Sequence, residues 1–243
     1  MEVMMLVLKM IGFWFVSMIL STTVHECGHV VGGLLEGWKF FYLVVGPVRI
    51  YREKLQDKIR VGIEKNVSLW GGIGGTIPAK KEDVKISSFG RILLAGPLAS
   101  MILGVIAAVL GLLLHSLFFL MLMGVALGMG GSCLIPGIKT GILYNDGSRY
   151  YRIHRGGQEQ AEEEAIFYAA FREYINPDAP YSEDSIQTLL RSKDVEFRYA
   201  AHYYAYENAK EAGNAEEMQA QIDAMNGMEK VPAAIRQIYA IEN

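Results

Sequence analysis

The chain opens with an apolar run that is longer than any ordinary core helix. The run extends from about Val3 to Leu35, and between Met4 and Val24 only Lys9 is charged. At about 1.5 Å per residue, a helix of this length exceeds the roughly 30 Å hydrocarbon core of a bilayer. We therefore expect a membrane-spanning helix that tilts or protrudes, with Gly37 as its C-cap.

The pattern His25-Glu26-Cys27-Gly28-His29 lies inside this run. Histidines four residues apart share one helix face, so both imidazoles can reach one metal ion, and the glutamate between them can act on a bound water. Zinc is the usual occupant, and such a helix normally supplies two of its three protein ligands. A purely structural, hydrogen-bonded histidine pair is the alternative. Because ionisable groups at membrane depth are costly, we favour a functional site.

Two further apolar runs predict a helical hairpin. They extend over Ile92–Leu114 and from Leu117 to about Ile135, and only His115-Ser116 separates them. Such a short connection makes the two helices antiparallel neighbours. The small residues of Ala95-Gly96-Pro97-Leu98-Ala99 allow close helix approach, and Pro136 ends the third run.

The connection between the first and second runs has a different composition. Segments 41–45 and 48–51 flank Gly46-Pro47 and predict two short strands with a turn, and 60–63 is a further candidate strand. The glycine-rich segment 70–78 is either a flexible linker or, as we favour, a loop or strand edge at the membrane surface. In that position it would border the metal site, because irregular backbone at membrane depth must line a cavity or pack on protein.

The charges divide the chain into two parts. Residues 1–155 carry a net charge of +7 and residues 156–243 a net charge of −10. Eleven Lys and Arg lie in the 37–91 connection, which predicts that this connection is cytosolic and that the N-terminus lies outside. The C-terminal part is then cytosolic as well. Basic residues gather beside membrane segments and form no separate domain, so nucleic acid is not an expected partner.

Residues 156–243 predict a soluble helical domain. The 195–225 region, broken at Gly213-Asn214 and rich in Ala and Tyr, has a faint tetratricopeptide character. The expected fold class is therefore mainly α: three transmembrane helices, a small β-rich region at the membrane surface and a C-terminal helical domain. The candidate helices of this domain are 162–174, 183–190, 195–211, 215–225 and 232–241.

A catalytic zinc site needs a third protein ligand and an open position for water. The best acidic candidate is Asp146, which follows the third apolar run and precedes Gly147. The alternative is an Asp-Gly turn on the cytosolic surface.

Taken together, the motifs resemble those of the site-2 protease family of intramembrane zinc metalloproteases. They occur in the family's order: His25-Glu26-Cys27-Gly28-His29 in the first core helix, Ala95-Gly96-Pro97-Leu98-Ala99 opening the second, and Pro136 followed by Asp146-Gly147 after the third. The resemblance covers residues 1 to about 155, which would form the metalloprotease core, and leaves the C-terminal domain outside. It also suggests a bacterial cell membrane as the location.

The resemblance implies a site and a mechanism. His25, His29 and Asp146 would bind one Zn²⁺, and Glu26 would be the general base that activates a zinc-bound water. The substrates would be transmembrane proteins or peptides. Their helices must unwind before attack, and an extended substrate could then pair with a strand edge in the 41–77 region.

The sequence departs from the family pattern in two places. Cys133 stands where the family usually has Asn, and the Pro136–Asp146 spacing of ten residues is longer than in many relatives. Cys133, Pro136, Gly72 and Gly75 are the candidate substrate-binding residues.

Two other functions are compatible with a membrane protein of this size. One is an inactive scaffold that binds a cytosolic protein through its C-terminal domain, and the missing Asn at Cys133 favours it slightly. Glu26 argues against it, because a scaffold needs no acid between two ligands. The other is a zinc transporter, which needs more intramembrane carboxylates. We therefore expect an intramembrane zinc endopeptidase.

Overall fold

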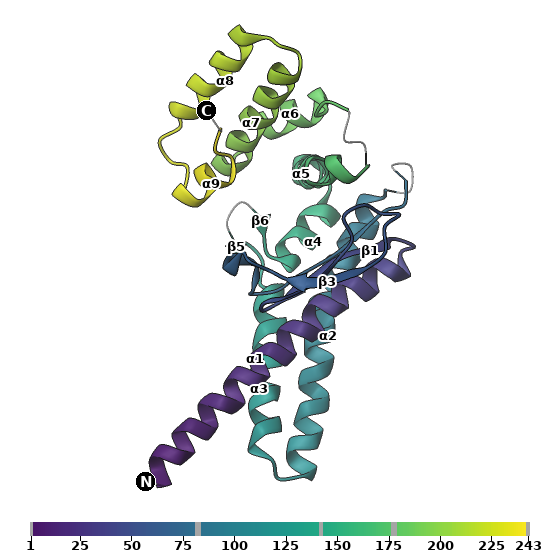
Figure 1. Cartoon of the computed structure of the whole chain (residues 1–243), viewed down its shortest axis with the longest axis vertical. Helices are drawn as coiled ribbons and strands as arrows, with labels where there is room; N and C mark the ends of the chain where they lie inside the picture. Colours follow the sequence, from purple (N-terminus) through teal and green to yellow (C-terminus); the bar gives the residue numbers. More distant parts are fainter. Residues whose placement is uncertain (1, 81–83, 141–142, 176–178, 242–243) are drawn as a thin grey trace. The chain divides into compact units, whose positions relative to one another are not determined.

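The computed structural model describes residues 2–80, 84–140, 143–175 and 179–241. They form two compact units, Met1–Pro136 and Gly137–Asn243 (Figure 1). Both units are mainly helical. The first also contains a four-stranded antiparallel sheet, and the second contains a two-stranded one.

The first unit begins with helix α1, Glu2–Leu35. At its end Gly37 has a φ of +80°, and the Trp38 amide donates to the Gly33 carbonyl at 2.9 Å. Glycine adopts this left-handed conformation without a Cβ clash, which lets the chain leave the helix. The predicted C-cap is therefore confirmed.

Helices α2, Ile86–Leu113, and α3, Leu117–Leu134, form the predicted hairpin. Helix α2 begins six residues before the expected Ile92, and its first turns contact the residues that follow α1. Phe89 stacks on Trp38, and Arg91 forms a bidentate ion pair with Glu36 at 2.6 and 2.7 Å.

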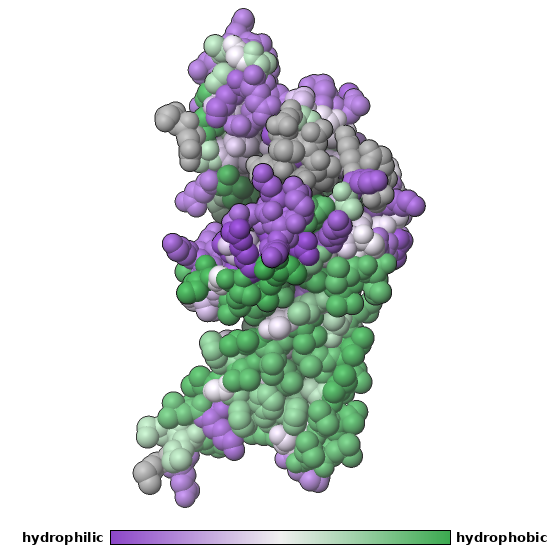
Figure 2. All heavy atoms as spheres, turned by 45° about the vertical axis from the view of Figure 1, so that its right-hand side comes forward, coloured by the Kyte–Doolittle hydropathy of each residue, from purple (hydrophilic) through white to green (hydrophobic). Residues whose placement is uncertain are grey.

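All three helices are long and apolar enough to cross a membrane. Large apolar side chains on their outer faces are exposed, and Figure 2 shows the continuous hydrophobic surface that they produce. A soluble protein rarely exposes so large an apolar surface. The first unit is therefore a membrane domain.

Small residues bring the spanning helices close together. A Cβ at Gly28 of α1 would lie 2.5 Å from the Ala95 carbonyl of α2, and one at Gly104 would lie 2.6 Å from Leu127 of α3. In lipid, helices associate through such close packing, because burial of apolar surface gives no drive there. The role expected of the small residues around Ala95 is thus observed.

The 37–91 connection folds into the sheet, in the order β3-β2-β1-β4. Segment 70–78 is no flexible linker, since most of it is β4, an edge strand of this sheet. The strands are β1, Lys39–Val45; β2, Val48–Tyr51; β3, Arg60–Ile63; and β4, Ile73–Ile77, with a short 3₁₀ turn η1, Val67–Leu69, before β4.

The second unit starts with a two-stranded ribbon and continues as helices. Helices α6 and α7 have the predicted bounds, α5 starts five residues earlier than expected, α8 is one residue longer, and α9 is shorter. The elements are β5, Lys139–Thr140; β6, Leu143–Tyr144; α4, Asp146–Arg155; α5, Gly157–Ile175; α6, Glu183–Leu190; α7, Val195–Glu211; α8, Ala215–Asn226; and α9, Ala233–Ile238.

Helix α4 was not expected. Asn145 caps it by accepting a hydrogen bond from the Ser148 amide at 2.9 Å, and Asp146 and Gly147 form its first turn. The alternative of an Asp-Gly surface turn is therefore wrong, because an Asn N-cap starts a helix here.

The two compact units meet at Pro136 and Gly137. The sequence motifs instead suggested a functional division between residues 155 and 156. The first division follows packing and the second follows motifs, so the functional division stays a prediction. The tetratricopeptide character of the α7–α8 pair stays a prediction as well.

Candidate metal centre

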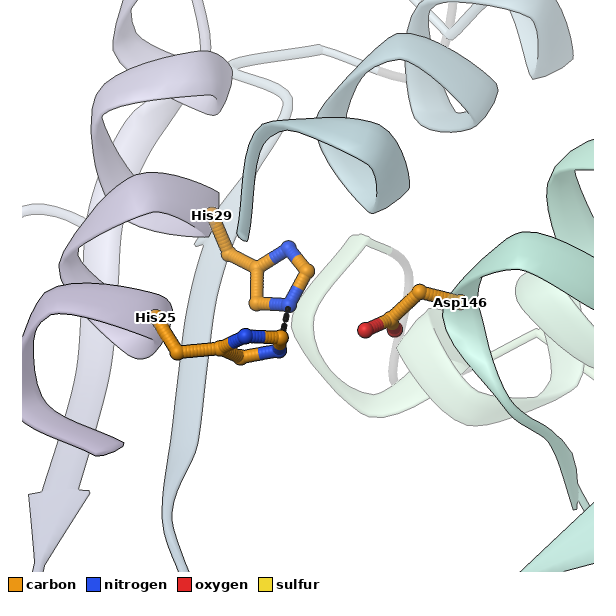
Figure 3. A group of neighbouring side chains, drawn as sticks. All are labelled: His25, His29 and Asp146. Atoms are coloured by element: carbon orange, nitrogen blue, oxygen red, sulfur yellow. Dashed lines mark hydrogen bonds between the residues drawn. The ribbon is translucent and has the colours of Figure 1, made fainter. Parts of the chain in front are cut away.

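Helix α1 presents His25 and His29 one turn apart on a buried face, with exposed fractions of 6% and 8%. Their Nε2 atoms are 3.3 Å apart, and Figure 3 shows the two rings meeting at these atoms. The i, i+4 spacing thus produces the convergence of imidazoles that the motif predicts.

The opposite nitrogen of each ring is held by helix α2. His29 Nδ1 lies 2.8 Å from the Ile92 carbonyl, and His25 Nδ1 lies 3.0 Å from Ser100 Oγ. A carbonyl only accepts, so His29 Nδ1 must donate, and in the neutral ring Nε2 then carries the lone pair. Contacts of this kind fix the tautomer and orientation of metal-binding histidines.

The separation of the two Nε2 atoms fits zinc. Two nitrogens bound at about 2.0–2.1 Å to a tetrahedral zinc ion are about 3.3–3.4 Å apart. The observed 3.3 Å needs no rearrangement of the His25 and His29 rings to meet this value.

Gly96 gives the His29 ring its space. A Cβ at this position would lie 2.5 Å from His29 Cε1 and closer still to Nε2, and real Cβ atoms do not approach other atoms so closely. The sequence indicated Gly96 only as part of a close-packing motif. The structure gives it a more specific role, because it contacts the ring of the candidate ligand His29.

Glu26 is half-buried on α1, next to the start of β4. Gly72 has a φ of +109°, and a Cβ there would lie 2.7 Å from Glu26 Oε1. A Cβ at Gly74 would lie 2.6 Å from the Glu26 carbonyl. The glycine-rich segment therefore borders Glu26, and Gly72 and Gly74 are the glycines that this close approach requires.

The loop that delivers Gly72 is anchored by Glu64. This buried carboxylate accepts hydrogen bonds from the Tyr42 hydroxyl and the Asn66 amide, both at 2.8 Å. The Trp70 indole donates to the Glu64 carbonyl at 3.0 Å. Glu64 thus fixes the chain two residues before Gly72, a role that sequence reasoning missed.

Three other predicted positions, Gly75, Cys133 and Pro136, lie in the same unit. A Cβ at Gly75 of β4 would meet no atom within 4 Å, so this residue faces open space. Cys133 is half-buried near the end of α3, and Pro136 is exposed just after it. The substrate-binding roles of Cys133, Pro136, Gly72 and Gly75 stay predictions.

Asp146 is the first residue of α4 in the second unit, where it is half-buried. A carboxylate in the first turn of a helix is stabilised by the helix dipole. Two nitrogens and one carboxylate oxygen are a donor set that zinc accepts while keeping a position open for water.

Sequence reasoning missed the residues that orient the site. Ser100 was not singled out, although it is a polar residue within an apolar run. It lies four residues after Gly96, on the same helix face. This spacing beside the small-residue motif is the signal that could have identified it.

Comparison with known proteins identifies the family of the chain. The model of peptidase family M50 matches residues 13–238. The chain belongs to this family, the site-2 proteases. No curated protein and no solved structure gives a significant match.

Membership makes the chain a protease of the metalloprotease class, and the three apolar helices make it a membrane protein. The match also corrects one expectation. The resemblance was expected to stop near residue 155, but the family match continues through most of the C-terminal helical domain, to residue 238. Helices α5 to α9 therefore belong to the family region.

Proposed function

We propose that this M50 protease is an intramembrane zinc endopeptidase that cleaves membrane-embedded proteins or peptides. The observation that carries the proposal is the histidine pair. The Nε2 atoms of His25 and His29 are 3.3 Å apart, and both Nδ1 atoms are held by α2. An inactive scaffold would have no use for this arrangement.

The proposed zinc ligands are His25, His29 and Asp146, drawn together in Figure 3. Each residue offers one ligand atom, and among the described residues they form a candidate metal-binding group. A zinc ion held there lowers the pKa of water and polarises the scissile carbonyl.

Glu26 is the proposed general base. It sits between the two histidines in sequence, and its carboxylate lies beside Gly72. In this role it accepts a proton from the attacking water and later delivers it to the leaving amine. No covalent bond to the enzyme is required.

We further propose that the substrate binds in an extended form. A transmembrane helix hides its carbonyls in internal hydrogen bonds, so it must unwind before cleavage. Strand β4 is an edge strand that pairs on one side with β1, and its residue Gly74 packs against the Glu26 backbone. A substrate strand that pairs with β4 would be held beside the catalytic base. Gly72 and Gly75 would then contact substrate.

The proposed orientation follows the basic residues. Since the 37–91 connection holds most Lys and Arg of the first unit, it lies in the cytosol, with the N-terminus outside. Lys9, near the N-terminus, then extends toward the outer surface.

The test uses purified protein in lipid vesicles with a model transmembrane substrate. Glu26→Gln should lower the cleavage rate by about 10²–10⁴-fold while the protein keeps its zinc. Glu36→Gln, one residue after the same helix, is the matched control and should cleave normally. Cleavage by Glu26→Gln at the wild-type rate would refute the proposed mechanism.

A further inference from the structure

The second unit contains a buried cluster of four charged side chains. Glu163 of α5 bridges two arginines of α4: its Oε2 accepts from Arg149 Nε at 2.8 Å, and its Oε1 accepts from Arg152 Nε at 2.7 Å. Arg152 Nη2 also donates to Glu162 at 2.5 Å. The Glu163 side chain is 1% exposed and both arginine side chains are 10% exposed.

These arginines project from the helix that begins at Asp146. Arg149 and Arg152 lie about one and two turns after Asp146, and being three residues apart they share one face of α4. One carboxylate that binds both of them restrains the rotation of α4 as well as its distance from α5.

The start of α4 is held by hydrogen bonds. Ser148 Oγ accepts from the Gly137 amide at 2.7 Å, and the Asn145 amide donates to the Ile138 carbonyl at 2.9 Å. These two bonds tie the first turn of α4 to Gly137 and Ile138.

The ribbon before α4 is tied to another helix. Lys139 Nζ contacts Asp194 at 2.8 Å and Glu196 at 3.0 Å, and the Tyr144 hydroxyl donates to Asp194 at 2.6 Å. Arg152 lies over the Tyr144 ring at 4.4 Å. The residues on both sides of Asp146 are thus bound to the helical domain.

Such a network is an unusual way to join two helices. Apolar side chains of similar volume would hold α4 on α5 at least as well, because buried ion pairs gain little net stability. What paired guanidinium and carboxylate groups supply is direction, since their hydrogen bonds are short and have a fixed geometry. The cluster therefore contributes more to the orientation of α4 than to the stability of its packing on α5.

We propose that Glu163 is a positioning residue for the zinc site: through Arg149 and Arg152 it sets the orientation of α4 and thereby of the Asp146 carboxylate. This inference rests on the proposed role of Asp146 as a zinc ligand. It gives the helical domain a part in the metal centre and makes it more than an attached module.

The test measures zinc affinity by competition with a chelator on the full-length protein, in wild type, Asp146→Ala, Glu163→Gln and Arg155→Gln. Arg155 is the matched control, because it lies on α4 but its side chain is 72% exposed. We expect Glu163→Gln to bind zinc about tenfold more weakly, the lower end of the effect of residues that support metal ligands. Arg155→Gln should stay within about twofold of wild type.

A second readout separates positioning from stability. Cobalt bound in place of zinc absorbs visible light according to its ligand geometry, and only folded, metal-loaded protein contributes. Glu163→Gln should change this spectrum, and Arg155→Gln should not. The double variant Arg149→Met/Glu163→Met removes both partners of one buried ion pair and keeps the Arg152–Glu162 pair, so it tests the same point if Glu163→Gln fails to fold.

The outcomes are distinguishable. Wild-type affinity and spectrum in Glu163→Gln, or in the folded double variant, would overturn the positioning role while Asp146→Ala still loses zinc. Wild-type zinc affinity in Asp146→Ala would overturn the proposed ligand set, and the positioning role with it.

Discussion

The histidines and the aspartate of the proposed zinc site are held by two different kinds of interaction. His25 and His29 lie on a membrane helix, where Gly96 makes room for one ring and α2 holds both Nδ1 atoms. Asp146 begins helix α4, which buried ion pairs attach to α5 of the C-terminal helical domain. In lipid, close packing of small residues is the available means of fixing a helix. In the second unit, charged groups can be buried in pairs.

Because of this difference, different substitutions should disrupt the histidine side and the aspartate side of the site. Steric changes should damage the histidine side, and changes of charge should damage the aspartate side.

The largest effect is expected from Gly96→Ala. The added Cβ would occupy the space of the His29 ring, so the ring must leave its position. We expect zinc affinity to fall more than about 100-fold, beyond the effect of removing a supporting hydrogen bond, with loss of proteolysis. Gly124→Ala is the control, because a Cβ there meets nothing within 4 Å. A Gly96→Ala protein that binds zinc normally would show that close packing does not hold the histidines.

Arg152→Ala should have the next largest effect. It should lower the stability of the α4–α5 pair. The substitution removes the arginine partner of the buried Glu162 carboxylate and leaves Glu163 with Arg149 alone, and breaking a buried pair costs about 3–5 kcal/mol. Hydrogen exchange of the α4 and α5 amides measures this loss. Arg155→Ala, at an exposed position of the same helix, should change exchange by less than about 0.5 kcal/mol. Equal effects of the two variants would contradict the importance of the buried cluster.

Ser100→Ala tests the polar contact on the histidine side. Loss of the hydrogen bond to His25 Nδ1 should weaken zinc binding about tenfold, without loss of the fold. Chelator competition measures the change. Thr23→Val removes a hydroxyl of α1 that bonds only locally, to the Ile19 carbonyl, and should bind zinc like wild type. If both variants bind alike, Ser100 does not orient the ligand.

The smallest expected effect is on the stability of the second unit at low pH. Burial raises the pKa of the Asp194 carboxyl, but hydrogen bonds from Lys139 and Tyr144 outweigh burial and hold this pKa below its usual 3.8. Burial and Asp194 raise the pKa of Tyr144 to about 12, so its hydroxyl remains a donor in acid.

Because the folded pKa of Asp194 is the lower one, its stabilisation is present above pH 3.8 and is lost as the pH falls through the folded value. Asp194→Asn should remove this part of the acid sensitivity of the second unit, by less than about 1 kcal/mol for a partly exposed pair. Thermal unfolding at pH 5 and pH 3 measures it. An unchanged pH dependence in the variant would exclude Asp194 as its source.

The sequence was most informative where a pattern has one physical cause. The structure contains the three apolar helices, the strand pair around Gly46 and the left-handed glycine at position 37. In each case, the lipid or the turn geometry allows one conformation for the pattern. The i, i+4 histidines also converge as the helix period requires.

The sequence was least informative where distant residues decide the outcome. Ser100 holds His25 across 75 residues of chain, and Glu163 binds Arg149 fourteen residues away. The spacing of Ser100 from Gly96 marks a shared helix face but does not name His25 as its partner, and the Glu163–Arg149 contact leaves no local pattern. Helix α4 was missed because Asp146-Gly147 is typical of turns, and Asn145 as its cap was not weighed. The early end expected for the family resemblance had a similar origin, since no short motif marks the helical domain.

The most direct test of the central claim is the zinc content of detergent-purified protein, measured by elemental analysis. If one ion is shared by residues of both units, wild type and Glu26→Gln should hold about one zinc per chain. His25→Ala and Asp146→Ala should each lose it, although they lie in different units. A full complement of zinc in Asp146→Ala would contradict the claim that both units hold the metal.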